Sequence, residues 1–224
     1  TFANGATQNN TNSFTVLSQA TNLNSNSGIS ASSVNGNGGQ IYIAGNDSLN
    51  TAAQIQSNGS NGGLIILSSP AGIYQNTGYI QTNGGAGLGG TIAQSGLITT
   101  TLIGSTLEAN GTNGGGNIII GRDFQANPLY GSAAQDALLP ILGSVITLPT
   151  SQVTTIDQTS TLSANAIRTG NGGNVLSWGE VLNAYGTFNA QGGLIAGNGG
   201  LVETSGANDV TVTGFSVNTR APNG

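Results

Sequence analysis

The stretch NGGLIILSS at 61–69 contains the pattern that decides the fold of this chain. Two glycines are followed by a short aliphatic run, and a β-branched residue, Ile65, stands two positions after the pair. The same arrangement occurs six times, as Gly38-Gly39 with Ile41, Gly62-Gly63 with Ile65, Gly89-Gly90 with Ile92, Gly115-Gly116 with Ile118, Gly172-Gly173 with Val175, and Gly199-Gly200 with Val202. Successive pairs lie 24, 27, 26, 57 and 27 residues apart, so the chain is a repeat with one enlarged unit.

A second pattern precedes each glycine pair and keeps the same phase. It consists of an apolar residue, any residue and a small residue, at Ile29–Ala31, Ile55–Ser57, Ile80–Thr82, Leu107–Ala109, Leu162–Ala164 and Phe188–Ala190. A third, weaker apolar segment also recurs in each unit, so each unit holds about three short strands separated by polar, glycine-rich turns.

A unit of this size cannot bury an apolar face alone, but stacked units can. Alternation in QIYI (40–43) and NIII (117–120) indicates strands with one buried face. We therefore predict an all-β fold, a parallel β-helix with 24–27 residues and three short strands per coil. Its core ladder is the row Ile41, Ile65, Ile92, Ile118, Val175 and Val202.

The glycine pairs and the asparagines before them are interpreted as structural corner residues. Asn37, Asn61, Asn171 and Asn198 directly precede a pair, and Asn and Gly tolerate the positive φ that a sharp corner needs. We also expect the stacked asparagine side chains to hydrogen-bond along the corner. Leu88 interrupts this pattern, which predicts a distorted corner in that unit.

The 57-residue step is one coil plus roughly thirty inserted residues. We place this looped-out insertion at about 125–156, which holds three of the five prolines, and predict a short helix within 132–142. Apart from this insertion, residues 1–224 are expected to form a single β-helix segment.

The composition excludes several classes of function. The chain of 224 residues has no His and no Cys, which removes the usual general base, thiol nucleophile and zinc ligands. Three Lys and Arg residues against eight Asp and Glu leave no basic patch for nucleic acid. The glycine-rich turns carry no recurring Asp of the calcium-binding β-roll type, so we expect no metal and no cofactor. No apolar run reaches the length of a membrane span.

Three stretches resemble the filamentous haemagglutinin family, the large exoproteins of two-partner secretion. They are NIIIGRDFQANP (117–128), TLSANAIRTGNGGNVLSWGE (161–180) and GNGGLVETSGANDVTVTGFSVNTRAPNG (197–224). The resemblance is strong over 105–224 and only repeat-like over 1–104. Where the family usually has a second glycine this chain has Arg122, so a local change at that corner is expected.

The resemblance implies a right-handed β-helix in an adhesin at the surface of a Gram-negative bacterium, exported by a partner transporter of the outer membrane. The NPNL- and NPNG-like motifs of the family's secretion domain are not in their expected place, so the resemblance indicates a stretch of shaft. We therefore expect a structural or adhesive segment without enzymatic activity. Few charges and many amides suit contact with host or matrix glycans or with other copies of the chain.

Two other classes of function stay open. The first is a carbohydrate-active enzyme, because Asp123 and Glu180 each lie seven residues after a glycine pair and would be neighbours on adjacent coils, at a spacing that suits a retaining glycosidase. Arg122 beside them favours a structural ion cluster instead. The second is a self-assembling extracellular fibre or sheath subunit, formed by edge-to-edge stacking of coil ends.

Aromatic residues and sequons supply the remaining candidate sites. Trp178, Tyr185, Tyr42, Tyr74 and Tyr79 would form a platform for sugars if they were exposed along one face, and packing is the more ordinary explanation of each. Four sequons, at Asn9, Asn46, Asn58 and Asn110, are candidates for surface glycosylation, although chance explains most of them in so Asn- and Ser-rich a chain.

Overall fold

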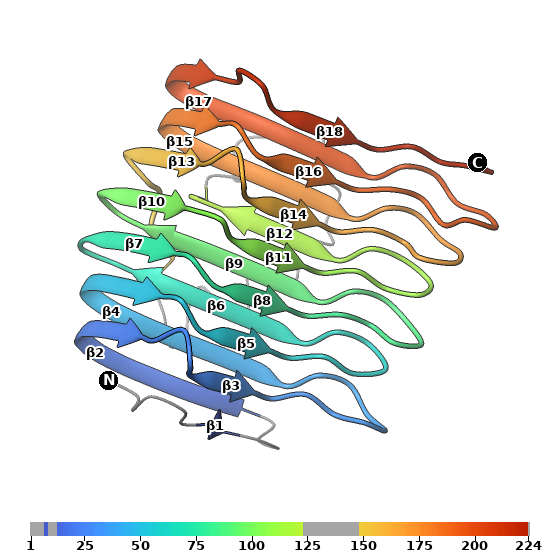
Figure 1. The fold of residues 1–224 in the computed structure, drawn as a ribbon, viewed down its shortest axis with the longest axis horizontal. Coiled ribbons are helices and arrows are strands. Elements are labelled where there is room, and N and C mark those ends of the chain that lie inside the picture. Colours follow the sequence, from blue (N-terminus) through green and yellow to red (C-terminus); the bar gives the residue numbers. More distant parts are fainter. Residues whose placement is uncertain (1–6, 9–12, 123–147, 224) are drawn as a thin grey trace.

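A computed structural model describes residues 7–8, 13–122 and 148–223, and these ranges contain strands and turns but no helix. Seven strands stack in parallel in the order β2, β4, β6, β9, β12, β15 and β17, and all of them except β2 carry a residue of the core ladder (Figure 1). The structure is a solenoid of seven coils, which confirms the parallel β-helix. Coil 1 is the coil of β2 and coil 7 that of β17.

Three walls surround the core of each coil. The first wall is built of β6 (Leu64–Ser69), β9 (Thr91–Gly96), β12 (Asn117–Ile120) and the first halves of four long strands, β2 (Ser13–Leu23), β4 (Gln40–Thr51), β15 (Asn174–Ala184) and β17 (Leu201–Thr211). The second wall contains the other halves of the long strands, with β7 (Ile73–Asn76), β10 (Thr99–Leu102) and β13 (Val153–Ile156). Together these two walls form one ten-stranded sheet.

The third wall is a separate eight-stranded parallel sheet of very short strands. Its members are β1 (Thr7–Gln8), β3 (Gly28–Ser30), β5 (Gln54–Gln56), β8 (Tyr79–Gln81), β11 (Thr106–Glu108), β14 (Thr161–Ser163), β16 (Thr187–Asn189) and β18 (Ser216–Asn218). Three separate strands per coil occur in coils 3 to 5. In four coils the first two strands are joined, and the long strand passes the corner by a register shift, as between Gly179 and Val181.

The core consists of inward-facing rows that run along the axis. Ile41, Ile65, Ile92, Ile118 and Val175 are directly paired from coil to coil and are fully buried, and Val202 in coil 7 packs on them while half-buried. The apolar members of the second repeat pattern form the facing row on the third wall, Ile29, Ile55, Ile80, Leu107, Leu162 and Phe188. Each aliphatic row is thus buried by its own copies in neighbouring coils.

The insertion falls largely outside the described residues, as does the short helix predicted within 132–142. The described residues nevertheless limit it, because β12 and β15 pair directly although 57 residues separate Ile118 from Val175. Residues 153–156, the end of the predicted insertion, form β13, which pairs with β10 and β15. These four residues therefore belong to the coil.

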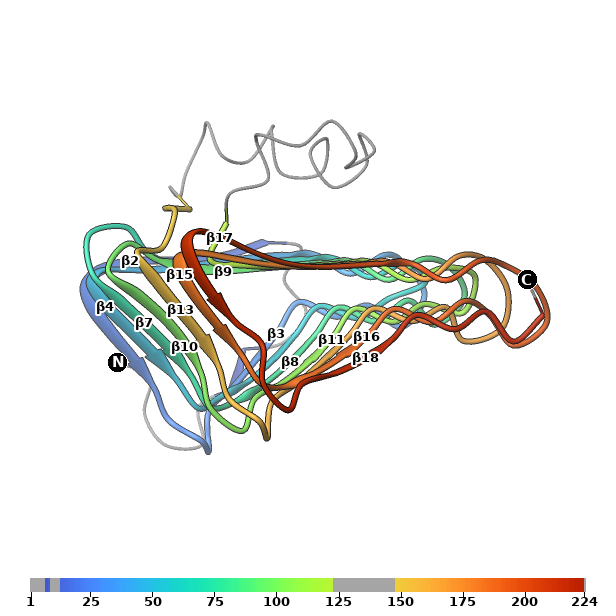
Figure 2. The ribbon, with the colours of Figure 1, turned by 90° about the horizontal axis from the view of Figure 1, so that it is seen from above.

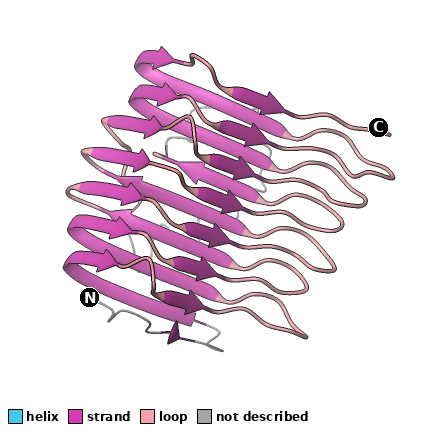
Figure 3. Ribbon diagram, in the orientation of Figure 1, coloured by secondary structure: helices cyan, strands magenta, loops and turns pink. Residues whose placement is uncertain are grey.

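Beyond the third wall, each coil extends into a thin arm before the next coil begins. The arms are the connections 31–39, 57–63, 82–90, 109–116, 164–173 and 190–200. Seen from above, the two sides of each coil converge toward these arms, so that the cross-section is a wedge with a narrow tail (Figure 2). In the side view the arms appear as stacked loops along one edge of the solenoid (Figure 3).

Candidate functional site

The glycine pairs lie where the two sides of a coil meet at the start of the arm. The second glycine of every pair donates its backbone N–H to the carbonyl of the small residue of the second repeat pattern, at 2.7–2.8 Å. The six bonds are Gly39 to Ala31, Gly63 to Ser57, Gly90 to Thr82, Gly116 to Ala109, Gly173 to Ala164 and Gly200 to Ala190. This contact explains why the two sequence patterns keep a constant phase.

Close approach of backbones, and not positive φ, is the reason for glycine here. None of the paired glycines or of the asparagines before them is among the residues with positive φ, so the conformational reason predicted for these corners is wrong. A Cβ on Gly62 would lie 1.9 Å from the carbonyl oxygen of Thr82, and one on Gly90 would lie 2.1 Å from that of Gly63. Both separations are far below van der Waals contact, so no side chain fits.

The asparagines before the pairs stack in two short ladders. Asn61 donates its side-chain Nδ2–H to Asn37 Oδ1 at 3.0 Å, and Asn171 Oδ1 accepts the backbone N–H of Asn198 at 2.9 Å. Between them stand Leu88 and Gly114, which carry no group that continues the ladder, although the Leu88 N–H donates to Asn61 Oδ1 at 2.9 Å. The Leu88 side chain is 54% exposed on the arm.

A longer asparagine ladder on the opposite side of the arm was missed by sequence reasoning. The side-chain oxygens of Asn58, Asn83, Asn110 and Asn165 each accept a backbone N–H from the next coil, at 2.7–2.9 Å. A sequence signal existed, since each of these residues stands three positions after the apolar residue of the second repeat pattern. The ladder holds the outgoing side of the arm in register.

Asn58 and Asn110 are also two of the four sequon asparagines, and their side-chain oxygens are occupied in this ladder. Asn46 is exposed, and its Nδ2–H donates to Asp47 Oδ1 at 2.8 Å. Asn9 lies outside the described residues. Glycosylation of any of them stays a prediction.

Arg122 has a backbone conformation that is unusual for a residue with a side chain. It is the one non-glycine residue with positive φ in the described ranges, at 62°, and it follows Gly121 at 73°. Its guanidinium donates from Nη1 to the Leu148 carbonyl at 2.6 Å, so it links the two described ends that flank the insertion. Its buried Nε has no hydrogen-bond partner.

The carboxylate pair of the enzyme hypothesis is not assembled by the described residues. Asp123 lies outside them, and Glu180 is exposed, with its backbone N–H donating to the Ser151 carbonyl at 2.9 Å. Among the residues that the structure describes, no three His, Cys, Asp or Glu side chains gather as a metal site, and no helix could cross a membrane.

The five aromatic candidates do not share one exposed face. Tyr74 is fully buried in the core, and Tyr42 is 7% exposed in a second apolar cluster that contains Ile66 of the first wall. Trp178, on the first wall, Tyr185, after β15, and Tyr79, on the third wall, are half-buried. The structure therefore separates them.

Tyr79 belongs to a hydrogen-bonded cluster around Glu108. Glu108 Oε2 accepts hydrogen bonds from Tyr79 Oη at 2.8 Å, Gln81 Nε2 at 2.7 Å and Asn83 Nδ2 at 3.0 Å. Partial burial alone would raise the pKa of Glu108, but these three bonds outweigh it and lower that pKa. Burial, followed by the bond to Glu108, raises the pKa of Tyr79 well above its ordinary value.

A polar groove crosses the corner between the second and third walls, and its shape comes from the lengths of the connections there. In coil 1 this connection has four residues, 24–27, whereas coils 2 and 3 turn with two, 52–53 and 77–78. Coils 4 and 5 use longer connections again, 103–105 and 157–160. The two short turns lie between longer ones, and they leave a depression about two coils wide.

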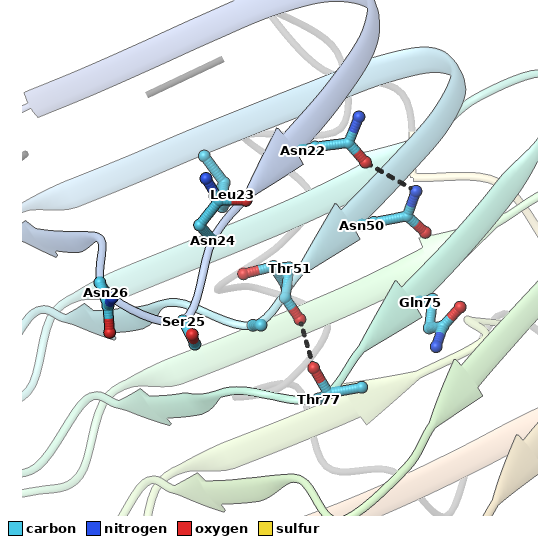
Figure 4. A pocket seen from close by; sticks show the side chains of 10 residues that line it. Asn22, Leu23, Asn24, Ser25, Asn26, Asn50, Thr51, Gln75 and Thr77 are labelled. Carbon is cyan, nitrogen blue, oxygen red and sulfur yellow. Dashed lines mark hydrogen bonds between the residues drawn. The ribbon is translucent and has the colours of Figure 1, made fainter. Parts of the chain in front are cut away.

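The groove has two parts that share Ser25, Ala52 and Thr77. The larger, of about 570 Å³, is lined by Asn22, Leu23, Asn24, Ser25, Asn26, Asn50, Thr51, Ala52, Gln75 and Thr77 (Figure 4). The smaller, of about 330 Å³, continues past Tyr79 to Gly104. None of the lining residues carries a charge.

Comparisons with known proteins leave this chain without an assigned family. No protein-family model matches the chain, and no curated protein does. Among solved structures it is similar to the HMW1 secretion domain from Haemophilus influenzae, with a TM-score of 0.55 and 17% sequence identity. The match covers 93% of this chain and 64% of that chain, so it extends over somewhat less than two thirds of the neighbour's length. At this identity the likeness shows a common fold.

Proposed function

We propose that this chain is a segment of the shaft of a large secreted adhesin on the surface of a Gram-negative bacterium. The observation that supports secretion is the likeness in fold, over 93% of the chain, to a domain whose name describes secretion, and the stacked coils support the shaft. The resemblance of 105–224 to the filamentous haemagglutinin family supports the same function, with a transporter of the outer membrane as export partner. The proposal includes no catalytic role.

The architecture suits a spacer. Every coil adds about 4.8 Å to the length, and seven coils make a stack of roughly 30 Å. Because each coil is held by the same rows of residues, a longer shaft needs only more coils of the same kind.

The location can be tested in the organism that encodes the chain. Antibodies against the purified chain should label intact cells in immunogold electron microscopy, and deletion of the cognate transporter gene should remove this label and leave antigen inside the cell. Surface label that persists without the transporter would contradict two-partner export, and antigen confined to the cytosol of the wild type would contradict the whole proposal.

A hydrolysis assay addresses the enzyme alternative separately. The proposal expects no glycan cleavage above background. Cleavage by the wild type that disappears in both Asp123→Asn and Glu180→Gln would replace the shaft by an enzyme.

A further inference from the structure

We infer that the groove between the second and third walls binds a neutral glycan chain, an inference that rests on the proposed function and gives its adhesive contact a place. The larger part of the groove, of about 570 Å³, exposes polar side chains from three successive coils.

Amide groups line one side of the groove in register. Asn22, Asn50 and Gln75 occupy the same outward position of successive coils, at the strand spacing of about 4.8 Å. Asn50 Nδ2 donates to Asn22 Oδ1 at 2.9 Å, and this bond fixes the direction of both amides (Figure 4). Asn22 Nδ2 and Asn50 Oδ1 remain as a donor and an acceptor facing the groove region.

The other polar groups of the groove add to this set. The side chains of Asn24, Ser25 and Gln75 make no hydrogen bond to another described residue, and Asn24 and Ser25 are exposed on the longer connection of coil 1. Each side-chain amide can both donate and accept hydrogen bonds, and so can each sugar hydroxyl. A ligand dense in hydroxyl groups can therefore pair with every one of these groups.

An aromatic ring lies where the groove continues onto the third wall. Tyr79 is half-buried, and its hydroxyl is fixed by Glu108 Oε2, so the ring has a fixed position beside Gly78 and Gly104. At Gly104 an added Cβ would meet only Thr159 Oγ1, at 3.7 Å, so the space on that side is open. The apolar face of a sugar ring can pack on such a surface while its hydroxyls reach the amides.

Other classes of ligand fit less well. The lining has no charge for a phosphate, a sulfate or an acidic peptide, and its floor of Ala52 and Thr77 has no deep apolar pocket to hold a side-chain anchor. Strands β4, β7 and β10 next to the groove are paired on both sides, so among the described strands that border it only β2, which pairs with β4 alone, offers an edge for strand addition by a peptide. These properties leave a neutral, polyhydroxylated chain.

The test is titration of the whole chain with three neutral hexasaccharides, cellohexaose, maltohexaose and mannohexaose, with a heparin-derived hexasaccharide as the charged comparison. Binding would be followed by isothermal calorimetry and by the side-chain amide signals in ¹H–¹⁵N spectra. We expect saturable binding of at least one neutral probe, little changed by salt, with shifts at Asn22, Asn50 and Gln75.

Three variants locate the site. Ala52 is half-buried on the groove floor, so Ala52→Trp fills the groove from below and should weaken binding more than about 10-fold. Gln75→Ala removes one pair of hydrogen bonds and should weaken it about 3- to 10-fold. Thr155→Ala changes the same outward row two coils away, outside the groove, and should leave the affinity unchanged.

Several results would overturn the inference. One is that no neutral probe binds at millimolar concentration, and another is that only the heparin fragment binds, in a salt-sensitive way. A third is that Ala52→Trp binds at wild-type strength while its thermal unfolding shows a native fold. The surface-labelling experiment reports on the proposed function independently, because the groove variants leave export unchanged. A failure of one proposal is therefore visible apart from a failure of the other.

Discussion

The backbone hydrogen bond that closes a coil is donated by the second glycine of a pair. This glycine has no room for a side chain. The first glycine of each pair is equally restricted, because the Cα hydrogen that a side chain would replace points at a backbone carbonyl of the next coil. In Gly89 an added Cβ would lie 1.9 Å from the Ala109 oxygen. Since that oxygen belongs to the backbone of the next coil, neither side can yield locally.

We therefore expect Gly89→Ala to lower the free energy of unfolding by at least about 2 kcal/mol. Gly85→Ala in the same arm is the matched control, because its Cβ meets only the Gly59 oxygen at an ordinary 3.5 Å, and it should change stability by less than about 0.5 kcal/mol. Urea unfolding of both variants measures the difference, and equal effects would refute the close-approach argument.

A buried glutamine is the weak point of the aliphatic stack. Gln94 is fully buried between Leu67 and Ile120 on the first wall, and neither its Nε2 nor its Oε1 has a partner. Burying an unpaired amide is unfavourable, so Gln94→Leu should raise the free energy of unfolding by about 1–2 kcal/mol. A lower stability of this variant in chemical denaturation would mean that ordered water satisfies the amide.

The Glu108 cluster makes stability depend on pH in a definite direction. Because folding lowers the pKa of Glu108 below its ordinary 4.5, the ionised carboxylate stabilises the fold above that value, and this contribution disappears as the pH falls through the lowered pKa. Glu108→Gln should accordingly lose less stability than the wild type between about pH 5 and pH 2. Asp157, whose pKa is also lowered, remains in both proteins, so parallel acid titrations of thermal unfolding isolate Glu108.

At the level of elements, asparagine ladders hold the arms, and one of them is broken in the middle. Leu88 and Gly114 occupy the two ladder positions between Asn61 and the Asn171 pair, and the apolar side chain of Leu88 lies largely in solvent. Leu88→Asn would place a second amide beside Asn61 Oδ1 and remove exposed apolar surface.

We expect Leu88→Asn to stabilise the chain by about 0.5–1 kcal/mol in thermal unfolding. Leu88→Ala separates the two effects, because it removes the apolar surface without supplying the amide, and it should not stabilise. A gain of the same size in Leu88→Ala would show that the ladder contributes nothing at this position.

The sequence predicted the rows of this fold better than its corners. Ile65 and its equivalents stand at a constant distance after the glycine pairs. Since equivalent residues of successive coils stack, this spacing alone predicts the core row. The reason for the glycines was misassigned because the side chain is excluded by the backbone of a neighbouring coil, as at Gly62 beside Thr82, and local sequence does not reveal how closely two coils approach there. The Asn58 ladder carried a periodic signal that was present and overlooked.

The groove was not predictable in the same way. It exists because two connections are shorter than their neighbours, and those lengths are defined only when the ends of β4, β5, β7 and β8 are known. Asn22 and Gly104 both line it, although they do not occupy equivalent positions of the repeat. Trp178 and Tyr79 lie on different walls for the same reason. The wall on which an aromatic residue lies depends on where the chain turns from one strand to the next.

For the whole molecule, the coil ends determine how copies meet. Among the described strands, β17 and β18 each pair on one side only, with β15 and β16, and Val217 on this edge is 44% exposed. Unpaired backbone next to apolar side chains favours strand-to-strand association.

We expect the chain of 224 residues to associate with increasing concentration in sedimentation velocity, and Val217→Lys to suppress this by adding a charge at the edge. Val34→Lys is the control, because Val34 is 96% exposed on an arm away from this edge. Association that is insensitive to Val217→Lys, or equally reduced by Val34→Lys, would place the contact elsewhere, and the fibre alternative would lose its support.

The pairing of every wall with the coil above and below has a mechanical consequence. Strand-to-strand hydrogen bonds connect neighbouring coils, so a pull along the axis loads all the bonds of one interface together, on three walls at once. A pull on a free chain end instead detaches one strand after another, and each step breaks only a few bonds. The same solenoid should thus resist tension between its two ends strongly and yield to peeling at a much lower force.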